Sequence, residues 1–215
     1  MDVKVSISLF SADYLHIADE IEKINKSSAD MLHIDVMDGS FVELYGLNQI
    51  WIQQIHEICK KPMDIHFMTP VDKRKMDSFD FDYISTYLFH MESMKDSGLK
   101  EALYYTERLK KLTGIVLSPE TEAVRILPYL PLVNEILVMT SQPGSMQSDF
   151  LPEMIKKIEL VKELIGEREI TLSVDGGLSW QSMNDCKNAG ANKIIIGRSF
   201  YHAPTIIDQF NKEKT

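Results

Sequence analysis

The chain has 215 residues, of which 44% are hydrophobic and 26% charged, and its formal net charge at pH 7 is −9. These values are ordinary for a soluble globular protein, and they argue against a general nucleic-acid surface or an anionic-membrane surface. An acidic protein binds a phosphorylated small molecule only locally, through backbone N–H groups or one well-placed cation.

Short β-rich runs alternate with amphipathic stretches along the chain. In chain order, the predicted strands are Val5–Leu9, Met31–Asp35, Met63–His66, Tyr83–Leu88, Gly114–Leu117, Glu135–Met139, Ile170–Val174 and Lys193–Ile196. The predicted helices between and after them are Tyr14–Asn25, Gln49–Lys60, Val71–Ser78, Leu99–Leu112, Thr121–Tyr129, Pro152–Ile165, Trp180–Ala189 and Pro204–Asn211. This alternation is typical of parallel βαβ units.

The pattern predicts an α/β fold, with a closed (β/α)8 barrel favoured over a doubly wound open sheet. No Gly-x-Gly-x-x-Gly turn follows the first predicted strand, and candidate ligands end the second, third and seventh strands. In a barrel all strand ends face one mouth, whereas in an open sheet these strands could be far apart. We expect one domain spanning residues 1–215.

The remaining composition points to the cytoplasm. The chain has two cysteines, Cys59 and Cys186, which are expected to be reduced and buried. The first residues lack the basic start and apolar core of a signal peptide, and no apolar run approaches membrane-spanning length.

Four residues with metal-ligating side chains end strand-like runs. They are His33 and Asp35, His66, and Asp175. Residues two apart on a strand point the same way, so His33 and Asp35 are expected to face the barrel axis together. Each residue alone has an ordinary explanation, as a hydrogen-bonded core histidine or a helix cap. Together, two imidazoles and two carboxylates suit one divalent cation, and buried carboxylates are costly unless paired or metal-bound.

This set of side chains is compatible with two reactions. A bound cation acts as a Lewis acid, and two carboxylates on different strands are placed to remove a proton from one face of a carbon and return one to the other. That chemistry epimerises a carbon next to a carbonyl. Metal-assisted hydrolysis needs similar ligands, so the residues alone leave both reactions open.

Glycine-bearing turns follow the last three predicted strands. They contain Gly144, Gly176 with Gly177, and Gly197. In β/α barrels such late loops frequently bind phosphate through backbone N–H groups, although glycine also serves simple tight turns. Arg198 is either a charge-assisted phosphate contact or a surface residue.

Several segments together resemble the ribulose-phosphate 3-epimerase family, which includes D-allulose-6-phosphate 3-epimerase. The resemblance is carried by the sequences 8–13 (SLFSAD), 33–42 (HIDVMDGSFV), 64–68 (DIHFM), 90–92 (HME), 117–121 (LSPET), 138–140 (VMT) and 174–177 (VDGG). It runs over nearly the whole chain, and the ten-residue block from His33 is highly specific.

The resemblance implies a (β/α)8 barrel with one divalent metal ion such as zinc, iron(II) or manganese. The family's ligands match His33, Asp35, His66 and Asp175, and Asp35 and Asp175 would also be the two acid/base groups. Ser8 matches a family residue near the substrate, and Met37, Met68 and Met139 match methionines that line the family's pocket. The residues expected to bind substrate also include His66, Gly144, Ser145, Gly176, Gly177, Gly197 and Arg198. From the residues alone, those methionines would be read as core packing. The resemblance also suggests a homo-oligomer.

The sequence departs from the family pattern at the predicted phosphate end. The loop after the sixth strand reads Gln142-Pro143-Gly144-Ser145-Met146-Gln147-Ser148 where the family has two more glycines and an aromatic residue, and Arg198 replaces a serine. Ser141, Ser145 or Arg198 would then compensate as donors. The sequence thus predicts a metal-dependent 3-epimerase of a ketose phosphate, with D-ribulose 5-phosphate favoured over D-allulose 6-phosphate. The alternatives are an epimerase of another phosphorylated ketose, a non-catalytic phosphosugar-binding barrel and a metal-dependent hydrolase.

Overall fold

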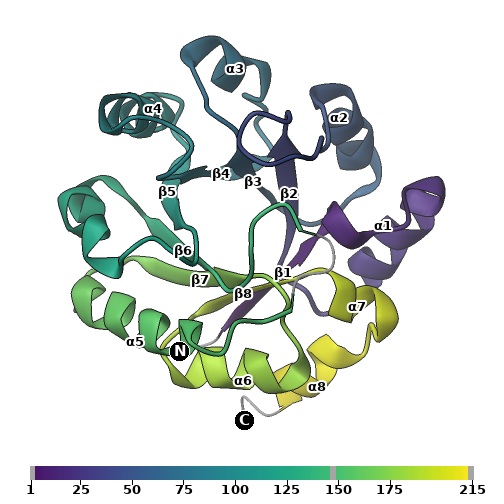
Figure 1. The fold of residues 1–215 in the computed structure, drawn as a ribbon. Coiled ribbons are helices and arrows are strands. Elements are labelled where there is room, and N and C mark those ends of the chain that lie inside the picture. Colours follow the sequence, from purple (N-terminus) through teal and green to yellow (C-terminus); the bar gives the residue numbers. More distant parts are fainter. Residues whose placement is uncertain (1–2, 146–148, 213–215) are drawn as a thin grey trace.

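A closed ring of eight parallel strands forms the centre of the molecule (Figure 1). The computed structural model describes residues 3–145 and 149–212. The strands are β1 (Lys4–Ser8), β2 (Met31–Met37), β3 (Met63–Met68), β4 (Ile84–His90), β5 (Leu112–Leu117), β6 (Glu135–Met139), β7 (Thr171–Asp175) and β8 (Lys193–Ile196). Pairing of β1 with β8, from Lys4 beside Lys193 to Ile7 beside Ile196, closes the ring. The predicted barrel is therefore confirmed, and the open sheet is excluded.

Helices surround this ring and cover the outer faces of the strands (Figure 1). The α-helices are α1 (Ile17–Lys26), α2 (Gln49–Ile58), α3 (Lys73–Ser78), α4 (Asp96–Arg108), α5 (Met154–Ile165), α6 (Trp180–Asn188), α7 (Arg198–His202) and α8 (Ile206–Lys212). Short 3-10 helices are η1 (Leu9–Ser11), η2 (Tyr14–His16) and η3 (Ala123–Leu132). Among the described residues, none of these helices is both long and apolar enough to cross a membrane.

The structure corrects two predicted helices and adds a helix that was not predicted. The stretch Thr121–Tyr129 does not form an α-helix, because Pro128 and Pro131 lack the N–H groups that an α-helix needs, and the segment is the 3-10 helix η3. The helix predicted to end at Leu112 stops at Arg108, where Lys110 adopts a left-handed φ of 59° and Leu112 begins β5. Helix α7 was not predicted, and it places Arg198 at its first residue.

Two different interiors result from the alternation of side chains along the strands. One side of each strand contributes to a large apolar core between the ring and the helices. The other side fills the barrel, where a small apolar cluster of Leu88, Val116, Leu137, Met139 and Ile195 lies beside polar and charged side chains. The polar part of this inner space positions the candidate site.

Candidate metal centre and active site

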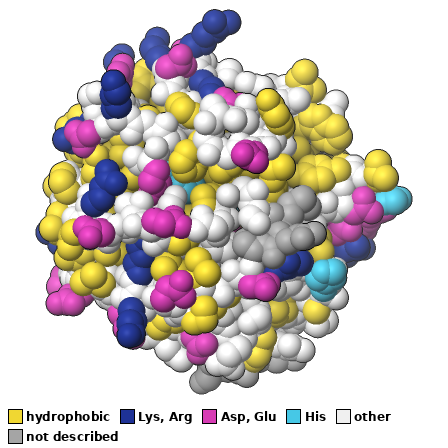
Figure 2. Space-filling model, viewed as in Figure 1, with side chains coloured by type: hydrophobic (Ala, Val, Ile, Leu, Met, Phe, Trp, Pro, Cys, Tyr) yellow, Lys and Arg dark blue, Asp and Glu magenta, His cyan; other side chains and the backbone are white. Residues whose placement is uncertain are grey.

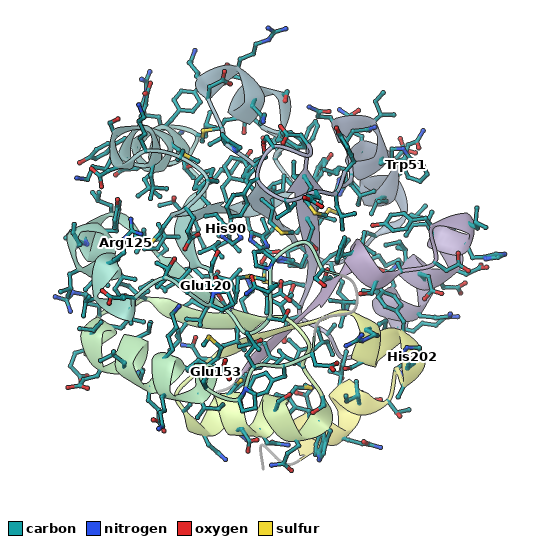
Figure 3. The ribbon with its side chains drawn as sticks, viewed as in Figure 1. Trp51, His90, Glu120, Arg125, Glu153 and His202 are labelled. Atoms are coloured by element: carbon teal, nitrogen blue, oxygen red, sulfur yellow. The ribbon has the colours of Figure 1, made fainter. Side chains whose placement is uncertain are left out.

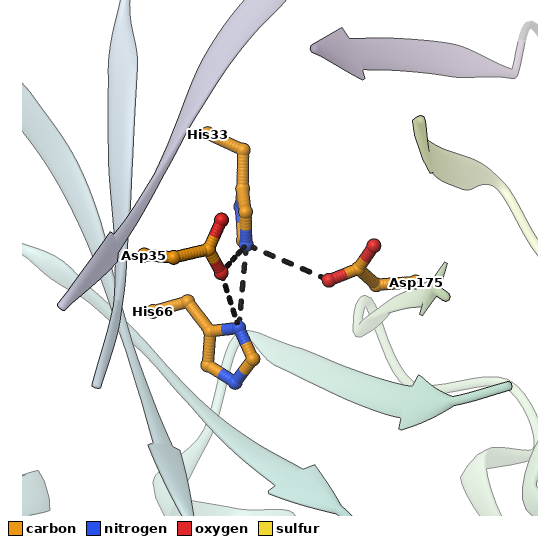
Figure 4. Close-up of side chains that lie close together, drawn as sticks. All are labelled: His33, Asp35, His66 and Asp175. Atoms are coloured by element: carbon orange, nitrogen blue, oxygen red, sulfur yellow. Dashed lines mark hydrogen bonds and ion pairs between the residues drawn. The ribbon is translucent and has the colours of Figure 1, made fainter. Parts of the chain in front are cut away.

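Strand register brings the predicted ligands together. On β2 and β3, His33 pairs with Asp64 and Asp35 pairs with His66, so two residues from each strand face the barrel interior. Asp175 ends β7 on the other side of the ring. Figure 4 shows His33, Asp35, His66 and Asp175 pointing toward one another from these three strands.

The four side chains offer donor atoms that converge on one point. His33 Nε2 lies 3.4 Å from His66 Nδ1 and 3.5 Å from Asp35 Oδ1. His66 Nδ1 lies 3.2 Å from Asp35 Oδ1, and His33 Nε2 lies 3.9 Å from Asp175 Oδ2. One donor atom from each of the four residues lies within 4.8 Å of all the others. Two imidazole nitrogens and two carboxylate oxygens in this arrangement fit a divalent metal.

Neighbouring side chains hold the ligands in place. The hydroxyl of Ser8 donates to Asp35 Oδ2 at 2.6 Å and accepts from the N–H of Phe10 at 3.1 Å. Asp64, which is not one of the four, lies behind His33, with its Oδ1 2.8 Å from His33 Nδ1. Such outer contacts fix the ring orientation and the tautomer of a ligating histidine.

The two candidate acid/base groups lie in opposite electrostatic environments. Burial, together with the Asp35 and Asp64 charges, raises the pKa of Asp175 to about 7, although the His33 charge opposes this shift. Burial also acts to raise the pKa of Asp35, but His33 and His66 outweigh it and hold that pKa well below its usual value. Two carboxylates whose environments separate their pKa values are suited to acid and base roles. A bound divalent cation would favour the ionised form of both.

The pKa values of the two candidate ligand histidines also differ. Burial lowers the pKa of His66 to about 4, despite a hydrogen bond to Asp35 that acts in the opposite direction. For His33, burial is again the largest influence and lowers the pKa, but the Asp64 and Asp35 carboxylates together raise it well above its usual value. His66 is thus neutral in the pH range where a metal must bind, and His33 must release a proton first.

Most of the predicted substrate residues surround one small cavity next to these ligands. This cavity has a volume of about 70 Å³, and the predicted residues lining it are Ser8, Asp35, Met68, Met139, Gly144, Ser145, Asp175, Gly176, Gly197 and Arg198. His33, His66, Met37 and Gly177 do not line it. Met37 packs with Val42 and Met68 in an apolar cluster, as core packing would predict.

Close packing between loops accounts for two of the predicted phosphate-loop glycines. A Cβ on Gly177, whose φ is +65°, would lie 2.4 Å from the backbone nitrogen of Phe150. On Gly176, whose φ is +120°, it would lie 2.3 Å from Ser141 Oγ. Both positions therefore require glycine for the approach of the β6 and β7 loops, whether or not phosphate binds there.

At the predicted phosphate end, Arg198 lies at the mouth of the site. Its side chain is 40% exposed, and its guanidinium lies 3.4 Å from Asp149 Oδ1. It lines the same cavity as Ser145 and Gly197, which fits the interpretation as a substrate contact better than that of a remote surface residue. Met146, Gln147 and Ser148, where the sequence departs from the family pattern, lie outside the described residues.

A buried histidine on β4 extends the wall of the site. His90 points toward the middle of the barrel in Figure 3, and its ring stacks on His66 with the centroids 4.9 Å apart. Its Nδ1 lies 3.0 Å from Glu92 Oε2, and Glu92 also accepts hydrogen bonds from the Ser118 N–H at 2.9 Å and from the Thr121 hydroxyl. The signal in the sequence is His90 and Glu92 two residues apart where a strand ends.

Sequence reasoning missed one further group, a buried lysine and its partners. Lys193 at the start of β8 donates hydrogen bonds to Asp64 and to Glu135. The only sign in the sequence is a lysine and a glutamate at the first position of two apolar strands.

The outer surface around the site carries charges of both signs. Figure 2 shows acidic, basic and hydrophobic side chains intermixed over this face. This distribution agrees with the expectation of a local site for a small anionic ligand. Trp51 and His202, to which we assign no role, lie on the outer helices (Figure 3).

Comparison with known proteins gives consistent matches. A model of the ribulose-phosphate 3 epimerase family matches residues 4–201. The chain is 30% identical over 205 residues to ribulose-phosphate 3-epimerase of Synechocystis, covering 94% of this chain and 89% of that protein. It is 28% identical to the enzyme of the same name from Bacillus subtilis, covering 93% of this chain and 92% of that protein.

Solved structures support the barrel fold. One neighbour is a 3-hexulose-6-phosphate synthase with a TM-score of 0.66 and 16% identity, covering 94% of this chain and 93% of that one. Another is a mutant tryptophan synthase α-subunit from Pyrococcus furiosus with a TM-score of 0.70 and 10% identity, covering 100% of this chain and 97% of that one. At these identities the likeness concerns the fold alone.

Proposed function

Because the chain belongs to the ribulose-phosphate 3-epimerase family and is a carbohydrate epimerase, we propose that it interconverts D-ribulose 5-phosphate and D-xylulose 5-phosphate by two-base proton transfer. Its metal ligands would be His33, Asp35, His66 and Asp175. The observation that carries the proposal is the convergence of these four donors, with the two carboxylates on β2 and β7.

The donor set suits zinc, iron(II) or manganese. A divalent metal bound there supplies a Lewis acid, which stabilises the negative charge that develops on the substrate oxygens when the neighbouring carbon loses its proton. Ser8 holds Asp35 through the 2.6 Å hydrogen bond, and Asp64 orients His33.

The two aspartates would exchange protons with C3 from opposite faces. In one direction the ionised Asp35 removes the C3 proton, and the protonated Asp175 gives its proton to the other face, which inverts the carbon. Each aspartate then carries the other's former charge state. The reverse reaction, or exchange with water, restores the starting state. The placement of Asp35 on β2 and Asp175 on β7 supports proton exchange from opposite faces.

We propose that the phosphate is bound by the loops after β6, β7 and β8. The supporting observation is that Gly144, Ser145, Gly176, Gly197 and Arg198 line the same cavity as both aspartates. Arg198 would supply the cation that an acidic protein needs for a phosphorylated ligand.

We also propose that the chain forms a single domain and a homo-oligomer. Limited proteolysis tests the first proposal, and light scattering tests the second.

The test is proton exchange followed by NMR in D₂O. Metal-loaded protein is incubated separately with ribulose 5-phosphate and with allulose 6-phosphate. We expect deuterium at C3 and formation of xylulose 5-phosphate with the first sugar. Exchange with allulose 6-phosphate alone would transfer the proposal to the six-carbon substrate, and no exchange with either would contradict an epimerase of these sugars.

Variants of the two aspartates test the mechanism. Asp35→Asn and Asp175→Asn should each lower turnover by at least about 100-fold, because each removes one proton-transfer group. Asp38→Asn is the matched control, since Asp38 follows the same strand but its carboxylate binds Lys75 at 2.8 Å. Normal turnover in either of the first two variants would contradict the two-base mechanism.

A further inference from the structure

A row of buried charges lies beneath the proposed metal centre. Lys193 is 2% exposed, and its ammonium donates to Asp64 and, at 3.0 Å and 3.2 Å, to the two oxygens of Glu135. Asp64 in turn contacts His33 Nδ1 at 2.8 Å. The row thus runs from β6 through β8 and β3 to the ligand on β2, across the inside of the barrel.

We propose that Lys193 is a positioning residue of the metal centre: its ammonium, balanced by Glu135, holds Asp64 in the orientation that directs His33 Nε2 toward the metal. The inference rests on the metal site proposed above, but it concerns residues that neither the metal nor the substrate touches.

Packing alone does not explain these charged residues. The same inner space holds Leu88, Leu137 and Ile195, which fill the barrel with no desolvation cost. Removing a carboxylate or an ammonium from water costs several kcal/mol per ion, and replacing such a buried pair by apolar residues is often neutral or stabilising. The desolvation cost of the buried charges therefore indicates that they serve the metal site and not only the packing of the barrel.

The effect on His33 follows from the hydrogen-bond chemistry of the row. An ammonium has three donors and no acceptor, and an ionised carboxylate only accepts. With Lys193 donating to one oxygen of Asp64, the other oxygen accepts the Nδ1 proton of His33. When His33 is neutral, as metal binding requires, its one proton is therefore on Nδ1, and Nε2 faces Asp35 and Asp175 with a free lone pair.

Lys193 also fixes the position of Asp64 in space. Asp64 stands on β3 and Lys193 on β8, which are not neighbours in the ring, so their contact crosses the barrel. Glu135 on β6 holds the ammonium from a third direction. Without the lysine, Asp64 keeps the contact with His33 but loses the partner that sets its rotamer.

The test compares metal affinity in three proteins. In the double variant Lys193→Met with Glu135→Leu, the ion pair is replaced by apolar side chains, so no second carboxylate is left unpaired. Lys111→Met is the matched control, because Lys111 is also largely buried and donates to the Phe81 carbonyl at 2.6 Å, but it lies outside the row. Zn²⁺ dissociation constants are measured by chelator competition, and Co²⁺ absorption reports ligand geometry.

We expect Zn²⁺ binding to weaken about 10- to 100-fold in the double variant, the usual effect of losing a partner behind a ligand, and the Co²⁺ visible bands to change. The control should bind Zn²⁺ within about twofold of the wild type. A folded double variant with unchanged affinity and unchanged Co²⁺ bands would overturn the inference.

A second measurement on the wild type covers the case in which the double variant does not fold. The ¹⁵N signal of the Lys193 ammonium should move when Zn²⁺ is added, while that of Lys111 should not. A Lys193 signal that stays in place would overturn the inference. If the wild type binds neither Zn²⁺ nor Co²⁺, the proposed metal centre fails and this inference with it. If the wild type binds metal and epimerises its substrate, only the role of Lys193 is in question.

Discussion

Replacing Asp175 by asparagine should stabilise the metal-free protein at alkaline pH while it removes activity. The pKa of this carboxyl is raised from 3.8 to about 7 by burial and the nearby carboxylates, against the opposing effect of His33. Between these pH values the folded protein binds more protons than the unfolded chain, so its stability falls as the pH rises through the window.

The size of the effect follows from the same values. One pKa unit corresponds to about 1.4 kcal/mol, so ionising Asp175 in the folded protein costs at most about 4 kcal/mol above pH 7. Asparagine has no charge to bury. We therefore expect the free energy of unfolding of metal-free Asp175→Asn to exceed that of the wild type by about 2–4 kcal/mol at pH 8. At pH 5 this difference in the free energy of unfolding should be smaller by about 2–3 kcal/mol.

Urea unfolding of chelator-treated protein at the two pH values measures this gap. Asp19→Asn is the control, because Asp19 is exposed on α1, far from the barrel interior. Added Zn²⁺ at about 100 times its dissociation constant should stabilise the wild type by about 2.7 kcal/mol and the variant by less, since the variant lacks one ligand. A gap that is the same at pH 5 and pH 8, or an asparagine variant that is less stable at pH 8, would refute the reasoning.

Three further predictions concern the metal, one loop and the wall of the site. Chelator treatment should abolish epimerisation, and Zn²⁺, Fe²⁺ or Mn²⁺ should restore it; full activity in protein shown to be metal-free would contradict a metal-dependent mechanism. Gly177→Ala should lower the free energy of unfolding by about 2–6 kcal/mol, because it adds overpacking against Phe150 to backbone strain. Gly166→Ala, at a similar φ of +60° but with the nearest atoms 3.9 Å away, should cost only the strain, about 1–3 kcal/mol. Equal losses in urea unfolding would contradict the clash. Glu92→Gln should lower the free energy of unfolding by about 2 kcal/mol at pH 7, because hydrogen bonds from His90 and Thr121 outweigh burial and lower the pKa of Glu92 from 4.5 to about 2. The stability that the ionised Glu92 contributes is present above pH 4.5 and is lost as the pH falls toward 2. In acid-induced unfolding, the stabilities of the wild type and the variant should therefore converge near pH 2.

The sequence was sufficient to predict the ring and the convergence of His33, Asp35, His66 and Asp175, because both depend on local patterns. Apolar runs bounded by turns mark the strands, and the spacing of His33 and Asp35 by two residues places them on one face. The family resemblance supplied the rest of the site, notably the methionines, since Met68 and Met139 have no feature in the sequence that separates a pocket wall from a core.

The interior charges could not be predicted, for a physical reason. Lys193 begins an apolar strand, a position that is typical of a lysine reaching solvent. Its contact with Asp64 depends on the ring being closed and on the stagger of β3, β6 and β8 around it. Strand periodicity fixes which face a residue lies on, but not which residues meet across a barrel. The prolines of η3, in contrast, are visible in the sequence, and they disfavour the α-helix that the apolar pattern of this segment predicted.

The placement of the proposed ligands on β2, β3 and β7 has a consequence for the order of folding. The seam where the ring closes, between β1 and β8, lies between the β2 ligands and Asp175. A growing chain that has not yet reached β7 offers at most three of the four donors. The complete site therefore appears only after the last quarter of the polypeptide has docked. A cation that requires all four donors would therefore bind only after β7 has docked. Such a cation would act as a late crosslink across the closing seam, and it should slow unfolding more than it speeds folding.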